Sequence, residues 1–208
     1  SFHIPTCFAG KKIFLHFEGV DAAFYVYINR RFVGYSQVSH MTSEFDITEQ
    51  LTQDDNEITV LVFKWCTGSY LEDQDMYRLS GIFREVYLLA RDPVHLRDFT
   101  IRSSLCADFS NAQISVTLDK TSDLPLSYTL YAPDGSCKAQ GETQENCFTI
   151  SLDQPQLWCD ETPHLYRLLL HMGEEYIAYP IGIRHLEIQG RVVTLNGKKI
   201  KCKGVNRH

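Results

Sequence analysis

Residues Glu57–Trp65 read Glu-Ile-Thr-Val-Leu-Val-Phe-Lys-Trp, and they form the strongest predicted strand of the chain. β-Branched and aromatic residues favour extended structure. Because the run is almost continuously apolar, it predicts a strand that is buried on both faces. No segment of the 208 residues has a convincing helical period over ten residues, and Ile47–Gln53 predicts one helical turn at most. The sequence therefore predicts an all-β chain.

Residues before this strand show the pattern of β-hairpins. Ile13, Leu15 and Phe17 alternate with Phe14, His16 and Glu18, and Phe24–Ile28 and Phe32–Tyr35 follow as a strand pair. The turn between the two is predicted at Asn29–Arg31 because Asn adopts turn conformations readily. Two further extended segments are predicted at Thr42–Ile47 and Ile82–Leu89.

A second set of strands begins after Asp92-Pro93. Several short strands at a spacing of roughly 8–12 residues are typical of a β-sandwich. The span from Pro93 to about Glu187 fits one immunoglobulin-like domain, which has about 100 residues. The predicted strands are Leu96–Ser103, Gln113–Leu118, Ser127–Ala132, Cys147–Leu152, Leu165–Leu170 and Tyr176–Ile183.

The final stretch, Leu195–His208, predicts a hairpin turn followed by a short apolar strand. Asn196-Gly197 is the preferred pair for a type I′ turn. The strand leads into Gly204 and then into a polar run. Barrel enzymes place their chemistry at such strand ends. We therefore expect this stretch to lead into the active site of a longer parent protein.

The segment Cys66–Gly81 is a long connection between two predicted strands, and long connections inside compact domains are often functional. It contains three acids, two tyrosines and an arginine. Carboxylates can bind sugar hydroxyls, while an aromatic ring stacks on the apolar face of a pyranose. Oxygen ligands of this kind can also hold hard cations such as Na⁺ or Mg²⁺. The alternative is a solvated acidic loop without a ligand.

Composition excludes several classes of partner. The net charge is −6, which argues against nucleic acid and against an anionic membrane surface. No apolar run approaches the roughly 20 residues of a spanning helix, and no signal peptide is recognisable at Ser1–Pro5. The seven cysteines include no Cys-x-x-Cys pair, so reduced thiols and a cytoplasmic location are expected. Asn56-Glu57 imitates the catalytic Asn-Glu pair of some barrel enzymes but is interpreted as a turn that enters a strand.

Residues Gly68–Val86 closely resemble the large β-galactosidases of glycoside hydrolase family 2. The string Glu72-Asp-Gln-Asp-Met-Tyr-Arg-Leu-Ser-Gly-Ile-Phe83 is the most specific part. Similar resemblance extends over Phe17–Phe24, Pro155–Trp158 and Asn196–His208, so that nearly the whole chain is covered. Tyr77 stands where close members of the family often have Trp.

The resemblance implies three structural parts. Residues 1–92 would be a jelly-roll-like, sugar-binding β-sandwich whose N-terminal part is missing, and residues 93–187 an immunoglobulin-like β-sandwich. Residues 188–208 would begin a (β/α)₈ catalytic barrel. Because a jelly roll needs about eight strands, we expect an open sheet edge and self-association of the chain.

The resemblance also implies a function for the parent protein. The family cleaves terminal β-D-galactosides, such as lactose, with retention, using two barrel glutamates. These lie beyond His208, so the chain carries no catalytic residue and is expected to be inactive alone. Asp75 matches a residue that binds galactose and a sodium ion, and His208 matches one that contacts the substrate. No cofactor is expected in the chain itself, whereas Na⁺ and Mg²⁺ are expected in the full-length parent.

The expected partner is a galactoside substrate, and the parent is expected to be a homo-oligomer. Two kinds of alternative remain at this point. The chain could be a stand-alone carbohydrate-binding module or an adhesion-type interaction sandwich. The parent could instead be another family 2 glycosidase, a β-glucuronidase or a β-mannosidase, because these share the three-domain plan.

Overall fold

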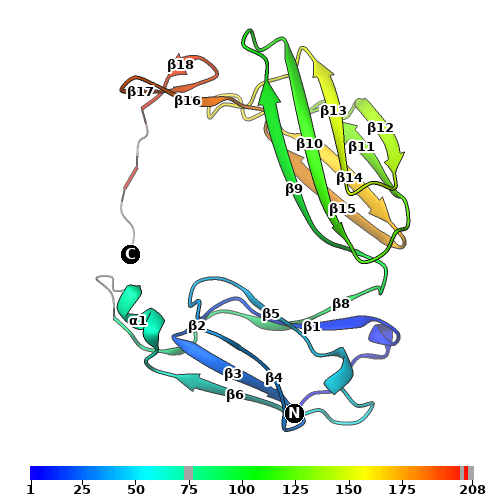
Figure 1. Cartoon of the computed structure of the whole chain (residues 1–208), viewed down its shortest axis with the longest axis vertical. Helices are drawn as coiled ribbons and strands as arrows, with labels where there is room; N and C mark the ends of the chain where they lie inside the picture. The colour runs from blue at the N-terminus through cyan, green and yellow to red at the C-terminus, as the bar shows by residue number, and fades with distance from the viewer. Residues whose placement is uncertain (73–76, 202–203, 206–208) are drawn as a thin grey trace. The chain divides into compact units, whose positions relative to one another are not determined.

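The chain folds as two compact units, Ser1–Pro93 and Val94–His208. The computed structural model describes residues 1–72, 77–201 and 204–205. Both units consist of β-strands, and among the described residues the short helical turns lie in the first unit (Figure 1); this confirms the all-β prediction of two successive sandwiches. Among the described residues, no helix has the length and apolar character needed to span a bilayer.

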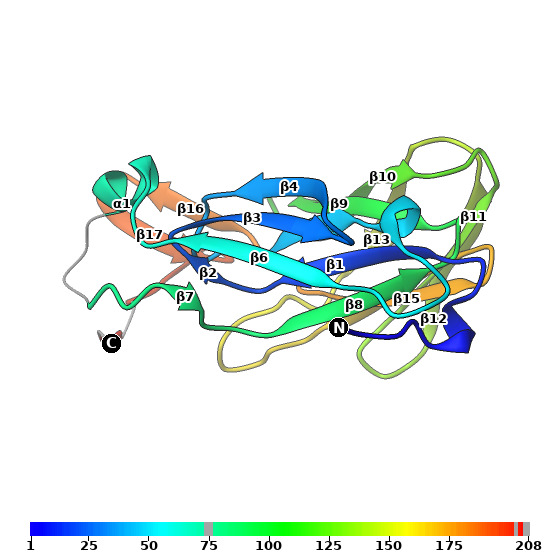
Figure 2. The ribbon, with the colours of Figure 1, turned by 90° about the horizontal axis from the view of Figure 1, so that it is seen from below.

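Two three-stranded antiparallel sheets, with orders β5-β1-β8 and β4-β3-β6, build the first unit, together with a two-stranded pair β2-β7. In Figure 2, β4, β3 and β6 lie side by side as one layer. The strands are β1 (Lys12–Phe17), β2 (Val20–Asp21), β3 (Ala23–Ile28), β4 (Arg31–Ser36), β5 (Ser43–Asp46), β6 (Ile58–Phe63), β7 (Gly81–Ile82) and β8 (Val86–Arg91).

The facing sides of these two sheets enclose the core of the first unit. Alternate side chains of a strand point to opposite faces, so every second residue of β1 and β3 is buried. At Gly34, an added Cβ would lie 2.5 Å from the Phe45 ring. The missing side chain at this position therefore lets Phe45 pack into the core. The buried apolar residues are Ile13, Leu15, Phe17, Val20, Phe24, Val26, Ile28 and Ile47.

The Glu57–Trp65 segment forms β6 as predicted, but only one of its faces is buried. Ile58, Val60 and Val62 pack against the core, whereas Thr59, Leu61 and Phe63 are exposed. The prediction of burial on both faces is therefore wrong. The reason is that no further layer of this unit covers the outer side of the β4-β3-β6 sheet in the part of the chain that the structure describes.

The first unit has three short helical turns: η1 (Thr6–Phe8) before β1, η2 (Thr48–Gln50) between β5 and β6, and α1 (Thr67–Leu71) between β6 and β7. The turn η2 lies within Ile47–Gln53, where one helical turn was predicted. The sequence did not predict α1, because five residues are too few to establish a helical period.

The second unit contains a three-stranded sheet of order β13-β10-β9 and a four-stranded sheet of order β12-β11-β14-β15. This layout suits an immunoglobulin-like sandwich. The strands are β9 (Leu96–Leu105), β10 (Asn111–Lys120), β11 (Leu126–Tyr131), β12 (Cys137–Thr143), β13 (Cys147–Asp153), β14 (Tyr166–Met172) and β15 (Glu175–Ile181).

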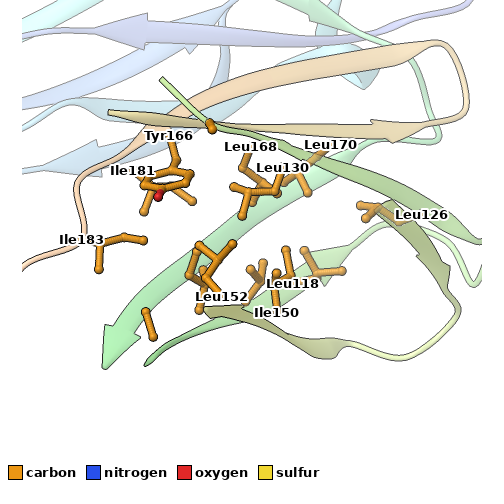
Figure 3. Close-up of a cluster of buried hydrophobic side chains, with 14 of the residues drawn as sticks. Leu118, Leu126, Leu130, Ile150, Leu152, Tyr166, Leu168, Leu170, Ile181 and Ile183 are labelled. Atoms are coloured by element: carbon orange, nitrogen blue, oxygen red, sulfur yellow. The ribbon is translucent and has the colours of Figure 1, made fainter. Parts of the chain in front are cut away.

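Side chains from both sheets meet in the core of the second unit (Figure 3). Leu130 and Leu168, from one sheet, are fully buried, as is Ile114 from the other. The phenolic oxygen of Tyr166, at the start of β14, accepts a hydrogen bond from the backbone N–H of Gln156 at 2.9 Å. That bond ties the preceding loop to the sandwich.

A small sheet follows, made of β16 (Leu186–Gln189), β17 (Val192–Leu195) and β18 (Lys198–Lys199). Its turn has positive φ at both Asn196 and Gly197, 50° and 75°, as a type I′ turn requires. The predicted hairpin is confirmed by the pairing of Leu195 with Lys198. Part of the predicted next strand falls on residues 202–203, outside the described residues, so the start of a barrel stays a prediction.

Candidate functional site

The long connection with three acids, Cys66–Gly81, is called the acidic connection, and it begins shortly after β6 ends at Phe63. The N–H of Cys66 donates to Ser69 Oγ at 3.1 Å, which closes the first turn of α1, and Ser69 is buried. Residues 73–76 follow and lie outside the described residues. The chain then returns to the sheet at β7, where Gly81 pairs with Asp21 of β2.

One arginine joins the two ends of this connection. Arg78 Nη2 donates to the carbonyl oxygen of Glu72 at 3.1 Å. The Glu72 N–H donates in turn to the Gly68 carbonyl at 2.8 Å. Because the residues before and after positions 73–76 are linked by hydrogen bonds, the loop has a closed base.

The return segment is anchored on a glycine. An added Cβ at Gly19 would lie 2.8 Å from Phe83 Cζ, so the Phe83 ring rests directly on this backbone. The next residue, Arg84, donates through Nη1 to the carbonyl oxygens of Glu18 and His40, at 3.4 and 3.2 Å. These contacts fix the return segment against two other loops of the unit.

A pocket of about 170 Å³ lies at the base of the acidic connection. Asp21 supplies a carboxylate, which accepts a hydrogen bond from Ser39 Oγ at 3.3 Å. The His40 and Phe83 rings lie with their centroids 5.3 Å apart. Carboxylate, imidazole, hydroxyl and aromatic groups together suit a hydroxylated ligand. The lining residues are Asp21, His40, Tyr77, Leu79, Ser80 and Phe83.

A second polar cluster surrounds Glu18, the residue before Gly19. Tyr87 Oη donates to Glu18 Oε1 at 2.8 Å, and Thr42 Oγ1 donates to Oε2 at 3.0 Å. These hydrogen bonds, first that of Tyr87, lower the pKa of Glu18 below its ordinary value. Donation to Glu18 correspondingly raises the pKa of Tyr87. The carboxylate is therefore held in its charged form.

His16 packs beside this cluster. Its ring stacks on Tyr87 with a centroid distance of 4.9 Å. Its Nε2 lies 2.8 Å from Glu44 Oε2, but off the direction of a hydrogen bond, and Nδ1 is buried without a hydrogen-bond partner in the described structure. The ring therefore acts chiefly as a packing element on the outer face of β1.

The two predicted site residues, Asp75 and His208, both lie outside the described residues. Sequence reasoning did not single out Asp21, His40 or Phe83, which line the pocket. They are far apart in the chain, so no local spacing could have indicated them. In the described ranges no group of three or more His, Cys, Asp or Glu side chains is arranged to hold a metal ion.

Comparison with known families gives two matches. Residues 1–92 match the sugar-binding domain of the glycosyl hydrolases family 2, and residues 94–184 match a further domain of that family. The chain belongs to glycosyl hydrolase family 2. The predicted family resemblance is thereby confirmed.

Family 2 relatives with curated names are similar over almost the whole chain. A β-galactosidase of Actinobacillus pleuropneumoniae is 47% identical over 200 residues, which is 95% of this chain and 20% of that protein. A β-galactosidase of Staphylococcus xylosus is 44% identical over 195 residues, 93% of this chain and 20% of that protein. The chain thus spans about one fifth of the length of these relatives.

Solved family 2 structures share the fold. A β-glucuronidase from an uncultured Clostridium aligns with 95% of this chain and 36% of its own, with a TM-score of 0.81 at 21% identity. A β-glucuronidase from Ruminococcus gnavus has a TM-score of 0.81 at 20% identity and covers 98% of this chain and 38% of its own. At this identity the likeness concerns the fold alone.

Proposed function

We propose that this chain is the non-catalytic, N-terminal segment of a retaining β-galactosidase that hydrolyses terminal β-D-galactosides such as lactose. The observation that carries the proposal is the identity of 47% and 44% to two proteins named β-galactosidase, over more than nine tenths of the chain. The structural likeness to β-glucuronidases is weaker in sequence, 20–21%, and does not favour their substrate.

In this proposal the acidic connection supplies one wall of the galactose pocket. The hydrogen bonds of Arg78 and Glu72 and the packing of Phe83 on Gly19 give the loop a fixed base. Asp75, near the middle of that loop in the sequence, would accept hydrogen bonds from galactose hydroxyls and donate one carboxylate oxygen to a sodium ion. His208 would contact the substrate where the barrel begins.

Catalysis itself would depend on two glutamates outside the 208 residues. In a retaining glycosidase one carboxylate attacks the anomeric carbon and the other first donates and later removes a proton. Asp75 would neither donate nor remove a proton in these steps. Its proposed part is to orient the sugar ring, which lowers the barrier by positioning. Sodium and magnesium would neutralise and order carboxylates around the pocket of the full-length parent.

Substrate choice is the direct test. The full-length parent should hydrolyse p-nitrophenyl β-D-galactoside and lactose with retention, and should act far more slowly on the matching β-glucuronide and β-mannoside. The 208-residue chain alone should hydrolyse none of them. Preferred hydrolysis of the glucuronide or the mannoside would instead support another family 2 glycosidase and reject the galactosidase proposal.

The second candidate is a stand-alone carbohydrate-binding module, because residues 1–92 match a sugar-binding domain. Calorimetry of the 208-residue chain with methyl β-D-galactoside separates the two. A segment that supplies only one pocket wall should show no detectable heat of binding. A module should bind this monosaccharide without the rest of the parent. A cytoplasmic, homo-oligomeric parent belongs to the first proposal.

A further inference from the structure

The four-stranded sheet of the second unit has a hollow at one end of its outer side. The turn after β11, the start of β14 and the end of β15 line this hollow, and its volume is about 330 Å³. Small-molecule sites in proteins have volumes of about 300–1,000 Å³, so a small ligand fits it. We call it the arginine hollow, and its lining includes Ala132, Pro133, Leu165, Arg167, Ala178 and Pro180.

Arg167 is the one charged residue of this lining. On the sheet it lies between its cross-strand partners, Tyr131 of β11 and Pro180 of β15. Its guanidinium carbon lies 5.4 Å from the centroid of the Tyr131 ring. An arginine that rests on an aromatic face is held in place by the cation–π attraction. Its N–H groups, which lie in the plane of the guanidinium, stay able to donate to a ligand.

No acid neutralises this guanidinium. Among the residues that the structure describes, Arg167 has the contact with Tyr131 but no ion pair. The acid of the adjoining turn, Asp134, is bound elsewhere: its Oδ1 accepts from the Ser136 N–H at 2.9 Å and from Ser136 Oγ at 2.6 Å. The hollow therefore carries an uncompensated positive charge in a chain whose net charge is −6. Such a local charge favours an anionic ligand.

The rest of the lining is mostly apolar. Alanine, proline and leucine side chains lie around the guanidinium, and Leu165 is 47% exposed. The one hydroxyl of the lining belongs to Tyr166, whose ring is buried and whose oxygen accepts from the Gln156 N–H at 2.9 Å. A sugar needs several polar partners, which this lining does not offer. An apolar group next to the charge fits it better.

We infer that the arginine hollow binds a small organic carboxylate with a branched apolar body. The carboxylate accepts two parallel hydrogen bonds from Arg167, since the planar guanidinium matches the geometry of a carboxylate. The apolar body covers Leu165, Ala178 and Pro180. The inference goes beyond the proposed function, because a neutral galactoside has no carboxylate and the hollow needs neither Asp75 nor the barrel.

An NMR titration of the 208-residue chain with 4-methylpentanoate tests the inference. The backbone amide signals of Gly135, Leu165 and Ala178 should shift and then saturate. The measurement belongs at neutral pH and low ionic strength, because salt screens an exposed ion pair. The neutral 4-methylpentanamide has nearly the same shape and should bind about tenfold more weakly, since it cannot form the charge-assisted pair.

Two arginine variants complete the test. Arg167→Gln should weaken the binding of 4-methylpentanoate about tenfold. The matched control is Arg102→Gln, at an exposed arginine on β9 of the same unit, which should leave the dissociation constant unchanged. The comparison of acid and amide uses the wild type alone, so it decides the matter even if a variant folds poorly.

Three results would overturn the inference. The first is the absence of saturable shifts with 4-methylpentanoate in the wild-type chain. The second is equal affinity for the acid and the amide, because Arg167 would then have no part in binding. The third is equal affinity for inorganic sulfate at the same signals, because the hollow would then attract any anion and would not recognise the apolar body.

Discussion

Asn56 shows how one buried polar side chain organises the turns at the end of the first unit. Its Oδ1 accepts from Asn29 Nδ2 and from the Thr52 N–H, each at 2.8 Å. Its Nδ2 donates to the carbonyls of Thr52 and Asp54, each at 3.0 Å. The Asn-Glu pair that imitates a catalytic motif therefore has its asparagine fully engaged in local structure.

Replacing this side chain should destabilise the first unit. Asn56→Ala removes four hydrogen bonds with Asn29, Thr52 and Asp54, and each such bond contributes about 0.5–1.5 kcal/mol. Urea unfolding should show a loss of at least about 2 kcal/mol. The exposed Asn146 provides the control, because Asn146→Ala should change the free energy of unfolding little. Equal effects of the two substitutions would show that the Asn56 network contributes no stability.

Asp108, in the turn between β9 and β10, predicts a pH dependence. Its Oδ1 accepts from Cys106 Sγ at 2.8 Å and from Ser110 Oγ at 2.8 Å. These bonds, first that of Cys106, lower its pKa from 3.8 to about 2. A carboxyl whose pKa is lower in the folded state stabilises the fold above its unfolded pKa. That contribution should disappear as the pH falls from about 3.8 to about 2.

The difference in melting temperature between wild type and Asp108→Asn measures this effect. It should be constant above pH 5 and should shrink as the solution is acidified toward pH 2, if the carboxylate is the stabilising form. Because the side chain is exposed, only the direction is predicted. A difference that grows on acidification would contradict the assigned hydrogen bonds.

At this scale the sequence predicted turn residues well and pocket residues poorly. Asn196-Gly197 adopts the two positive φ values expected of it, because that preference is local. Asp21 and His40 meet in one pocket only through the folding of distant loops. No spacing rule connects them.

The strand β14 supplies four buried residues to the second unit's core, as many as β10 does. It lies between β11 and β15 in the four-stranded sheet, and its Leu168 is fully buried. Leu168→Ala removes several buried methyl and methylene groups and leaves a cavity, which typically costs 2–5 kcal/mol. The loss in the free energy of unfolding can be measured by chemical denaturation, followed by a spectroscopic signal from the second unit.

Leu186 is the matched control, since it lies on β16 and is largely exposed. Leu186→Ala should change stability by less than about 0.5 kcal/mol. If the two leucine substitutions had similar effects, the assignment of Leu168 to the core of the sandwich would be wrong.

Strands with β-branched and apolar residues were predicted from sequence, because their alternation follows directly from the pleat. The strand β12 was missed. Its residues Cys-Lys-Ala-Gln-Gly-Glu-Thr carry no such signal, and it pairs as an edge strand beside β11. The sequence predicted the β6 strand but not the exposure of its outer face. An apolar run does not reveal whether a second layer covers the outer face of its sheet, so the exposure of Leu61 and Phe63 became visible only in the structure.

Considered as a whole, the first unit is open along part of its sandwich. Its two main sheets have three strands each, and a groove of about 420 Å³ runs between apolar residues. The groove is lined by Phe2, His3, Pro5, Phe8, Leu15, Ile58, Val86, Tyr87 and Leu88. Exposed strand edges beside apolar surface favour pairing with another chain.

Self-association of the purified chain follows from this opening. Sedimentation velocity should show a weight-average mass that rises with concentration. Val86→Lys places a charge on the exposed edge and in the groove, so it should shift the chain toward monomer. A strict monomer for the wild type at high concentration would contradict the prediction.

The family and the two-sandwich architecture could be recognised from the sequence, because its motifs run through nearly the whole chain. The pocket wall, the metal ligands and the oligomer stay predictions that rest on the resemblance, since the named relatives are about five times longer than the part that this chain matches. Substitution of Asp75 tests the role of this chain in the parent, because Asp75 lies in this chain and is proposed to act in the pocket of the parent.

The most direct measurement is therefore the kinetics of Asp75→Ala in the full-length parent with p-nitrophenyl β-D-galactoside. Loss of an orienting contact in the pocket should lower kcat/KM by about a hundredfold or more, with the melting temperature unchanged. Glu57→Ala, at an exposed acid directly before β6, should leave both quantities as in the wild type. Unchanged kinetics for Asp75→Ala would contradict the proposal that this chain supplies a wall of the galactose pocket.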